Sequence, residues 1–185
     1  MNDVLKTIKS RRSVRAYKSE LLNKGDLQTI VEAGIYAPTG CNDQPWHFSV
    51  VQDRTLLEEV NEKTKQAMTK VPFEWMNKIG QNPNTDVTHK APALIIVSMR
   101  KESASGPVDC IAAMENMMLA AESIGIGSCW MGFVRLIYSD AELMKKLGVP
   151  EGLEPQQAAV FGYKANEKIV VPERKLDVVT YIGFD

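Results

Sequence analysis

Apolar residues along this chain follow two spacings, one typical of helices and one typical of strands. A spacing of three to four residues predicts amphipathic helices over about 26–36, 54–70, 107–124 and 139–147. Near the N-terminus, Asp3 is expected to cap a short helix whose apolar stripe is Val4, Leu5 and Ile8. Residues 73–79 add a further turn or two. Apolar runs rich in β-formers predict strands over 47–51, 93–99, 128–131 and 158–163.

Two segments are more apolar than segments that lie exposed on the surface of a small protein. Between Cys110 and Ile124 the only clearly polar side chains are Glu115, Asn116, Glu122 and Ser123. A helix that is apolar nearly all round must be covered on more than one side, by the rest of the chain or by a second subunit. Residues 167–185 alternate apolar positions without a helical stripe, which predicts an extended tail that wraps its own domain or a partner.

The order of elements and the composition limit the class of protein. Strands that alternate with helices predict an α/β or α+β sandwich, and 185 residues is the size of one domain, here 1–185. A net charge of −1, from 22 basic and 23 acidic residues, argues against a globally basic nucleic-acid binder. No apolar run is long enough to cross a bilayer, so no membrane association is expected.

Cysteine and histidine usage narrows the chemistry further. Cys41, Cys110 and Cys129 are an odd number without paired spacing, and the N-terminus lacks an apolar signal segment, which together predict a reducing, cytoplasmic location. With only His47 and His89 and no Cys-x-x-Cys, we expect no metal site.

The strongest local feature is a basic cluster near the N-terminus. Residues 4–19 hold six Lys or Arg side chains and no acid, with Arg11, Arg12, Ser13 and Arg15 at its centre. Guanidinium groups and a hydroxyl suit a phosphate, so the cluster predicts an anion-binding site. A solvated helix end, where cations favour the C-terminal dipole, and a kinase target site are the alternatives.

Three other segments carry candidate chemistry. Residues 38–48 form a loop between helix and strand, in which Trp46 and Phe48 are expected in the core and Cys41 is more readily a bystander than a nucleophile. Residues 125–132 fail the dinucleotide fingerprint, because a tryptophan replaces its last glycine and a helix precedes the strand. Gly132 is expected to end that strand and let a ligand approach the backbone. The basic pair at 174–175 is weak by itself.

Together these segments resemble the nitroreductase family of FMN-dependent NAD(P)H oxidoreductases, as a short member matched over nearly the whole chain. The residues that carry the resemblance are Arg11-Arg12-Ser13-Val14-Arg15, Ala37-Pro38-Thr39, Gln44-Pro45-Trp46-His47-Phe48, Gly127 to Gly132, and Pro172-Glu173-Arg174-Lys175. The resemblance implies an α+β three-layer sandwich, with a mostly antiparallel central sheet flanked by helices. It also implies a homodimer with a flavin in each of two interface pockets, and a C-terminal tail that wraps the partner subunit.

The resemblance also implies which residues bind FMN. Arg11, Arg12 and Ser13 match the segment for the phosphate and ribityl chain, and Arg15 matches a basic position near the pyrimidine edge. Arg174, and more weakly Lys175, match a late basic position that closes on the phosphate. The loop of Pro38, Thr39 and Gly40, with Asn42 as a further candidate, is expected to reach the flavin from the other subunit. Trp130, Met131 and Gly132 match a strand end with backbone N–H groups near N5. Lys65 or Gln66 is a candidate for the contact that some larger members make in mid-chain.

The implied reaction is ping-pong. NAD(P)H delivers hydride to flavin N5, and a nitroaromatic, quinone or related acceptor then takes it, so no protein nucleophile is needed. A non-catalytic flavin-binding or carrier protein is the alternative function. A nucleic-acid-binding module built on the basic cluster is a third hypothesis, which the net charge disfavours.

Overall fold

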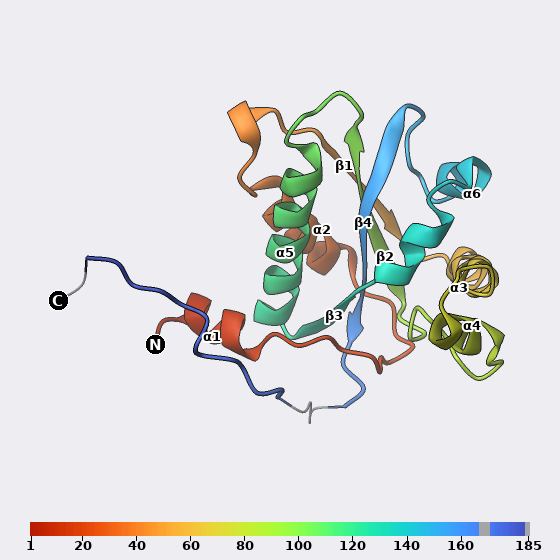
Figure 1. Cartoon of the computed structure of the whole chain (residues 1–185), viewed down its shortest axis with the longest axis horizontal. Coiled ribbons are helices and arrows are strands. Elements are labelled where there is room, and N and C mark those ends of the chain that lie inside the picture. The colour runs from red at the N-terminus through yellow and green to blue at the C-terminus, as the bar shows by residue number, and fades with distance from the viewer. Residues whose placement is uncertain (167–170, 184–185) are drawn as a thin grey trace.

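A computed structural model describes residues 1–166 and 171–183 of the chain. Helices and strands alternate along it (Figure 1). In chain order the elements are α1 (Asp3–Ser10), α2 (Lys24–Ile35), the 3-10 turn η1 (Gly40–Asn42), β1 (Trp46–Val51), α3 (Arg54–Met68), α4 (Glu74–Gln81), β2 (Ala93–Arg100), α5 (Gly106–Ser123), β3 (Ile126–Trp130), η2 (Gly132–Ile137), α6 (Ala141–Lys146) and β4 (Leu153–Tyr163).

The four strands form one sheet in the order β1-β2-β4-β3, and every neighbouring pair is antiparallel. This settles the choice between α/β and α+β in favour of α+β, as the family resemblance implied. β1 and β3 are the two edges of the sheet. That placement matters for the site, because the segments expected to bind a ligand lie beside these two edges.

Helices cover both faces of the sheet, which gives the expected three layers. Along β2, Leu94 and Ile96 face a core formed with α3, η2 and α6, while Ile95 and Val97 face a second core formed with α2 and α5. Both sets are fully buried, so the strand is apolar at successive positions instead of alternating with polar ones. The continuous run in the sequence therefore reflects a strand with helices on both sides.

Helix α5 is the apolar helix predicted at 107–124, and its own chain covers most of it. Gly34 lets α2 approach closely, since a Cβ atom there would lie 2.9 Å from Met117 Cγ. Val108 and Ile111 nevertheless remain exposed, with relative accessibilities of 69% and 46%. The described part of the chain therefore leaves these positions near the N-terminus of the helix uncovered.

Several expected boundaries are wrong. Asn2, not Asp3, caps α1, because its side chain is the one that accepts from Leu5 N at 3.0 Å while Asp3 already lies in the first turn. Residues 74–81 form a full helix, and η2 was not predicted. β3 begins at Ile126 and ends at Trp130, so Gly132 opens η2 instead of ending the strand.

The C-terminal tail has no regular secondary structure over residues 171–183, and its side chains are exposed. In Figure 1 it extends away from the sheet. Val170 and Phe184, two apolar positions of the predicted tail, lie outside the described residues. That the tail wraps a partner subunit stays a prediction.

Candidate functional site

The basic segment after α1 lies along the free edge of β3. Val14 N donates to Ser128 O at 2.9 Å, and Ser13 pairs with Ser128 in an isolated parallel bridge. Gly127 makes this approach possible, because a Cβ atom there would lie 2.8 Å from a methyl group of Val14. Tyr17 Oη donates to Val14 O at 2.6 Å and fixes the segment from the other side. The backbone of the segment is thus held to the sheet, so its side chains project from a rigid base.

The arginines of this segment differ in their partners. Arg11 Nε lies 3.3 Å from Glu115 Oε1 on α5. One terminal nitrogen of Arg12 donates to Lys9 O at 2.7 Å and to Arg11 O at 2.6 Å, so this side chain does cap the end of α1, as the helix-end alternative requires. Its Nε, however, is buried and has no acceptor among the residues that the structure describes. A buried N–H without a partner costs about 1–3 kcal/mol, which an acceptor from outside the chain would recover.

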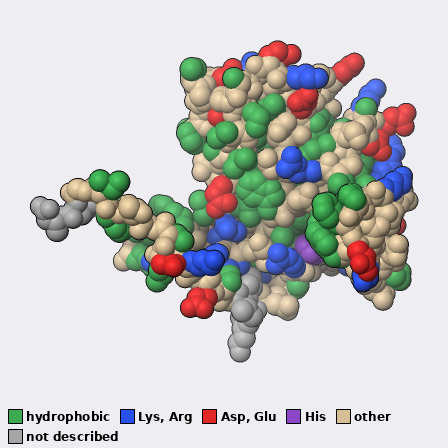
Figure 2. Space-filling model, viewed as in Figure 1, with side chains coloured by type: hydrophobic (Ala, Val, Ile, Leu, Met, Phe, Trp, Pro, Cys, Tyr) green, Lys and Arg blue, Asp and Glu red, His purple; other side chains and the backbone are tan. Residues whose placement is uncertain are grey.

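The rest of the segment surrounds a buried thiol and a histidine. Burial raises the pKa of the Cys129 thiol, while the Arg15 charge, a hydrogen bond with Ser13 and the Arg11 charge act in the opposite direction. Burial also lowers the pKa of His89, with Arg15 adding to the effect. Figure 2 shows basic side chains and histidine in the lower part of the view, where Figure 1 draws β3. The local positive charge predicted from the sequence is therefore concentrated at one edge of the sheet.

Residues at the end of β3 offer fewer groups than expected. Met131 is buried in the core and its N–H donates to Ala158 O at 2.8 Å, so neither its side chain nor its N–H faces a ligand. Trp130 is half-buried, and its Nε1 donates to Gln157 Oε1 at 3.2 Å. Gly132 is exposed, and no atom lies within 4 Å of the position that a Cβ atom would take. Of these three residues, Gly132 is therefore the one with free space beside it.

The loop of Pro38, Thr39, Gly40 and Asn42 does not meet the arginines within one chain. It leads into β1, at one edge of the sheet, whereas the basic segment lies beside β3 at the other. Three strand spacings of about 4.8 Å separate those edges by about 14 Å. The structure therefore brings together only the part of the predicted site that lies at β3.

The remaining predicted residues are scattered. Arg174 and Lys175 are exposed in the tail, and neither forms a hydrogen bond or an ion pair with the rest of the described chain. Lys65 is buried on α3, a helix that packs against η2, whereas Gln66 is exposed. Of the two candidates, Lys65 therefore lies on the packed side of α3 and Gln66 on its exposed side. Cys41 is an exposed free thiol in the loop before β1.

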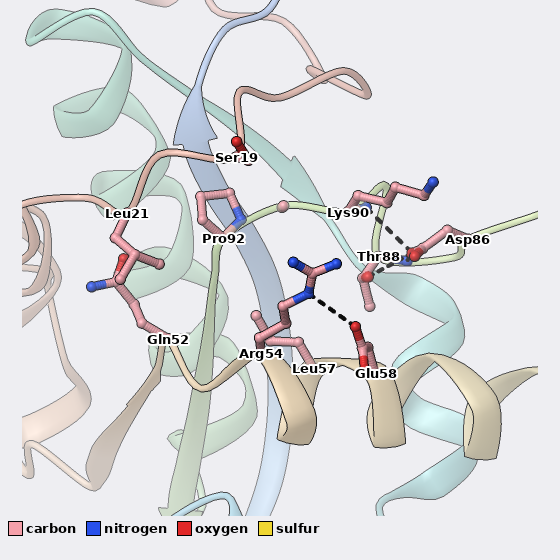
Figure 3. A pocket seen from close by; sticks show the side chains of 11 residues that line it. Ser19, Leu21, Gln52, Arg54, Leu57, Glu58, Asp86, Thr88, Lys90 and Pro92 are labelled. Atoms are coloured by element: carbon pink, nitrogen blue, oxygen red, sulfur yellow. Dashed lines mark hydrogen bonds and ion pairs between the residues drawn. The ribbon is translucent and has the colours of Figure 1, made fainter.

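A cleft of about 250 Å³ lies between the start of α3, the segment that follows Tyr17 and the loop that leads into β2 (Figure 3). Arg54 at its edge is paired with Glu58 at 3.0 Å. On the opposite side, Asp86 Oδ1 accepts from Thr88 Oγ1 at 2.6 Å and from Lys90 N at 3.3 Å. The same loop carries His89, whose N–H donates to Asp86 O at 3.1 Å.

Two residues of interest were not predicted from the sequence. His89 has a left-handed backbone (φ 57°), a conformation that is uncommon outside glycine and tends to persist at functional sites. Asp109 is a buried acid in the first turn of the apolar helix α5. A single acid two residues after Pro107, in an otherwise apolar segment, is the signal that could have pointed to it.

No helix in residues 1–166 and 171–183 is long and apolar enough to cross a membrane. In the same residues, no cluster of three His, Cys, Asp or Glu side chains is arranged to hold a metal ion.

Comparison with known proteins decides the family. Residues 8–163 match the Nitroreductase family. This chain belongs to the nitroreductase family. A nitroreductase from Bacteroides fragilis, solved with bound FMN, is 38% identical, with a TM-score of 0.90, over 98% of this chain and 100% of that one. A second FMN-bound nitroreductase, from Desulfitobacterium hafniense, is 29% identical, with a TM-score of 0.88, over 98% and 99% of the two chains.

A relative with a named activity is more distant. The FMN reductase [NAD(P)H] of Bacillus subtilis is 25% identical over 206 aligned positions, which cover 100% of this chain and 77% of that protein. Membership of the nitroreductase family confirms the resemblance that the sequence motifs indicated, and the fold of the FMN-bound structures matches the sheet and helices described above.

Proposed function

We propose that this nitroreductase-family chain is an FMN-dependent NAD(P)H oxidoreductase, with the phosphate of FMN bound by the basic segment beside β3. The observation that carries the proposal is the buried Nε of Arg12, an N–H without an acceptor in the described chain, within a positive segment that the sheet holds in place. FMN-bound relatives and the NAD(P)H-dependent relative support it.

The residues present fit this cofactor. Arg11, Arg12 and Ser13 supply N–H and O–H donors suited to a phosphate, on a backbone fixed by Val14. Arg15 is exposed beside them and would place a positive charge near the pyrimidine edge, where charge develops on reduction. We assign Arg174 and Lys175 to the closing of the phosphate site, and Gly132 to the wall near the flavin ring.

FMN held by Arg11, Arg12, Ser13 and Arg15 would supply hydride transfer from NAD(P)H to a second substrate in two separate half-reactions, which would make the kinetics ping-pong. We propose a nitroaromatic, a quinone or a related acceptor as that second substrate. The protein orients the reactants and supplies positive charge. Parallel lines in double-reciprocal plots at several acceptor concentrations are the expected result, and intersecting lines would contradict the ping-pong assignment.

We further propose that two copies of the chain form a homodimer with a flavin at each of two interface sites. The predicted site residues lie at opposite sheet edges of one chain, so a complete site requires a loop from a second copy. Exposed apolar residues support the proposal, since the relative accessibilities of Val4, Leu5 and Ile8 of α1 and of Val108 of α5 are 47–69%. A groove of about 320 Å³ between α1, α2 and α5 offers a place for the partner's apolar tail.

The test is the double substitution Arg11→Ala and Arg15→Ala, with Arg54→Ala as the matched control. Arg54 is exposed at the edge of the cleft of Figure 3, and its ion pair is with Glu58 on the same helix and not with a residue of the basic segment. We expect the double variant to keep its fold but to purify without FMN and to bind added FMN at least about a hundredfold more weakly, since each charged hydrogen bond contributes about 1.5–3 kcal/mol. Stoichiometric flavin in the double variant would refute the assignment.

The carrier alternative makes a separate prediction. If the chain only carries flavin, NAD(P)H will not bleach the bound flavin under anaerobic conditions. Rapid bleaching, as the oxidoreductase proposal requires, excludes the carrier.

A further inference from the structure

The loop that precedes β1 is fastened to α5 by one buried carboxylate. Asp109, in the first turn of α5, has a relative accessibility of 5%. Its Oδ2 accepts from Thr39 Oγ1 at 2.8 Å, and its Oδ1 accepts from Gly40 N at 3.3 Å. Ser105, just before the helix, donates to Oδ2 at 2.8 Å. Two of the three donors thus come from a loop that is about 70 residues away in sequence.

The carboxylate also acts on the loop through the Thr39 hydroxyl. That hydroxyl donates to Asp109 and accepts from Gln44 N at 3.0 Å, so the two ends of the turn are tied to the same group. Removing the carboxylate would leave the hydroxyl free to rotate and would loosen its contact with Gln44. Gly40 lies so close to α5 that a Cβ atom there would be 2.6 Å from Ser105 Oγ.

The loop needs this support because its backbone is strained. Cys41, Asn42 and Gln44 all have left-handed backbones, with φ angles of 52°, 56° and 46°. Residues other than glycine hold such conformations only where surrounding contacts impose them. Asp43, between them, binds Arg100 and also accepts from Ser103 Oγ at 2.6 Å, which anchors the far end of the loop to the connection between β2 and α5.

We propose that Asp109 is a positioning residue for the flavin site. Its carboxylate holds the loop 39–44 in the strained conformation in which the loop reaches the flavin bound by the second copy of the chain. The inference rests on the proposed function, because it needs a flavin at the interface. Asp109 itself lies under the loop, within its own chain, so it acts only through Thr39 and Gly40.

The test compares Asp109→Asn with Ser49→Ala. The asparagine has the same shape but keeps only one acceptor oxygen, so it cannot accept from both loop donors and Ser105. Ser49 is the matched control: it is also buried and its hydroxyl donates to Gly148 O at 2.8 Å, but it has no contact with the loop. Both substitutions disturb buried polar contacts, so the control shows what such a disturbance does away from the loop.

Cys41 supplies a readout that is independent of flavin and of activity. It is exposed and lies inside the strained turn, while Cys110 and Cys129 are buried. We therefore expect the thiol reagent DTNB to label Cys41 several-fold faster in apo Asp109→Asn than in the apo wild type, and at an unchanged rate in Ser49→Ala. Added FMN should slow the labelling of the wild type, because the loop then lies against the flavin.

The second readout is the dissociation constant of FMN. Hydrogen bonds to a charged group are strong enough for Asp109→Asn to weaken FMN binding by about tenfold or more, whereas Ser49→Ala should change it by less than about twofold.

Thr39→Val, which removes the hydroxyl but leaves the carboxylate, covers the case in which Asp109→Asn does not fold. It should reproduce both effects, and the double variant should add little to either single change.

The outcomes separate the two proposals. A wild type that binds no FMN overturns the proposed function. A wild type that binds FMN, beside an Asp109→Asn variant that binds it within about twofold, overturns the positioning role and leaves the proposed function intact. The positioning role also fails if Cys41 labelling accelerates while the affinity for FMN is unchanged, since the carboxylate would then hold a loop that does not reach the flavin.

Discussion

Gly127 on β3 is the position where one added methyl group should push the basic segment away from the sheet. A Cβ atom there would lie 2.8 Å from Val14 Cγ2 and 2.9 Å from Val14 Cβ and Cγ1. Carbon atoms in contact lie about 3.5–4.0 Å apart, so Gly127→Ala requires a shift of roughly 0.7 Å or more. Rotation of the valine cannot relieve the clash, because its own Cβ is among the crowded atoms. The backbone of the segment must therefore move away from β3.

The loss of stability in Gly127→Ala follows from these short distances. Overpacking of this kind costs about 1–3 kcal/mol, and part of it comes from weakening the Val14 N to Ser128 O hydrogen bond. For a chain of this length, 1 kcal/mol corresponds to about 2–4 °C in Tm. We therefore expect Gly127→Ala to lower the Tm of the apo protein by about 2–12 °C and, because Arg11 to Arg15 move with Val14, to weaken FMN binding by at least about tenfold.

The assay is a thermal melt of the apo protein together with a titration of FMN followed by flavin fluorescence. Gly132→Ala is the control, since it adds the same methyl group five residues later in a position with no atom within 4 Å. It should leave the apo Tm unchanged and weaken FMN binding only if the cofactor lies over Gly132. In Val14→Ala with Gly127→Ala, two of the three crowded atoms are gone, so the combined cost should be less than the sum of the single costs. An unchanged Tm and FMN affinity in Gly127→Ala would refute the reasoning.

Two further predictions concern titratable groups. Burial and the Asp109 charge raise the pKa of Cys110 to about 12, and Cys129 is also buried. DTNB should therefore label one thiol per native chain, the exposed Cys41, and all three thiols after unfolding. A second fast-reacting thiol in the native protein would contradict this. For His89, burial and the Arg15 charge lower the pKa of the folded state, so the unfolded chain takes up the proton first and stability should fall as the pH drops through about 6.5. His89→Asn, which suits the left-handed backbone, should reduce the difference in Tm between about pH 8 and about pH 5, and an unchanged difference would count against His89 as the cause.

Most of the sheet could be predicted because its strands are buried on both faces. The run at 93–99 corresponds to β2, and its fully apolar character follows from the helices on either side. β4 was predicted only from residue 158, whereas it begins at Leu153. Its first half contains Pro155, which normally argues against a central strand. The structure accommodates Pro155 at a register shift, where Val97 pairs with Gln157 but Ser98 pairs with Pro155.

The candidate site could be predicted only where the residues concerned are close together in the sequence. Six basic side chains within sixteen residues are visible in the sequence, and the structure places the centre of that cluster beside the free edge of β3. The contacts that make the cluster rigid are not local. The fit of Val14 against Gly127 joins positions more than a hundred residues apart, and Asp109 is bonded to a loop some 70 residues earlier. The spacing of residues along the chain carries no information about such pairs. The basic cluster could therefore be predicted from the sequence, whereas the contacts that hold its backbone in place could not.

The two groups of predicted site residues lie at opposite edges of the sheet, which composition alone could not reveal. The basic segment lies at the β3 edge and the loop 38–42 lies at the β1 edge, so no rearrangement of side chains within one chain can join them. A second copy related by a two-fold axis would bring the β1 edge of each chain to the β3 edge of the other, and by symmetry this contact would occur twice. On the proposed assembly, each chain therefore contributes the phosphate-binding half of one site and the loop of the other. The same proposed arrangement would bury the exposed apolar residues of α1 and α5 against the partner, which is the usual role of an exposed apolar patch.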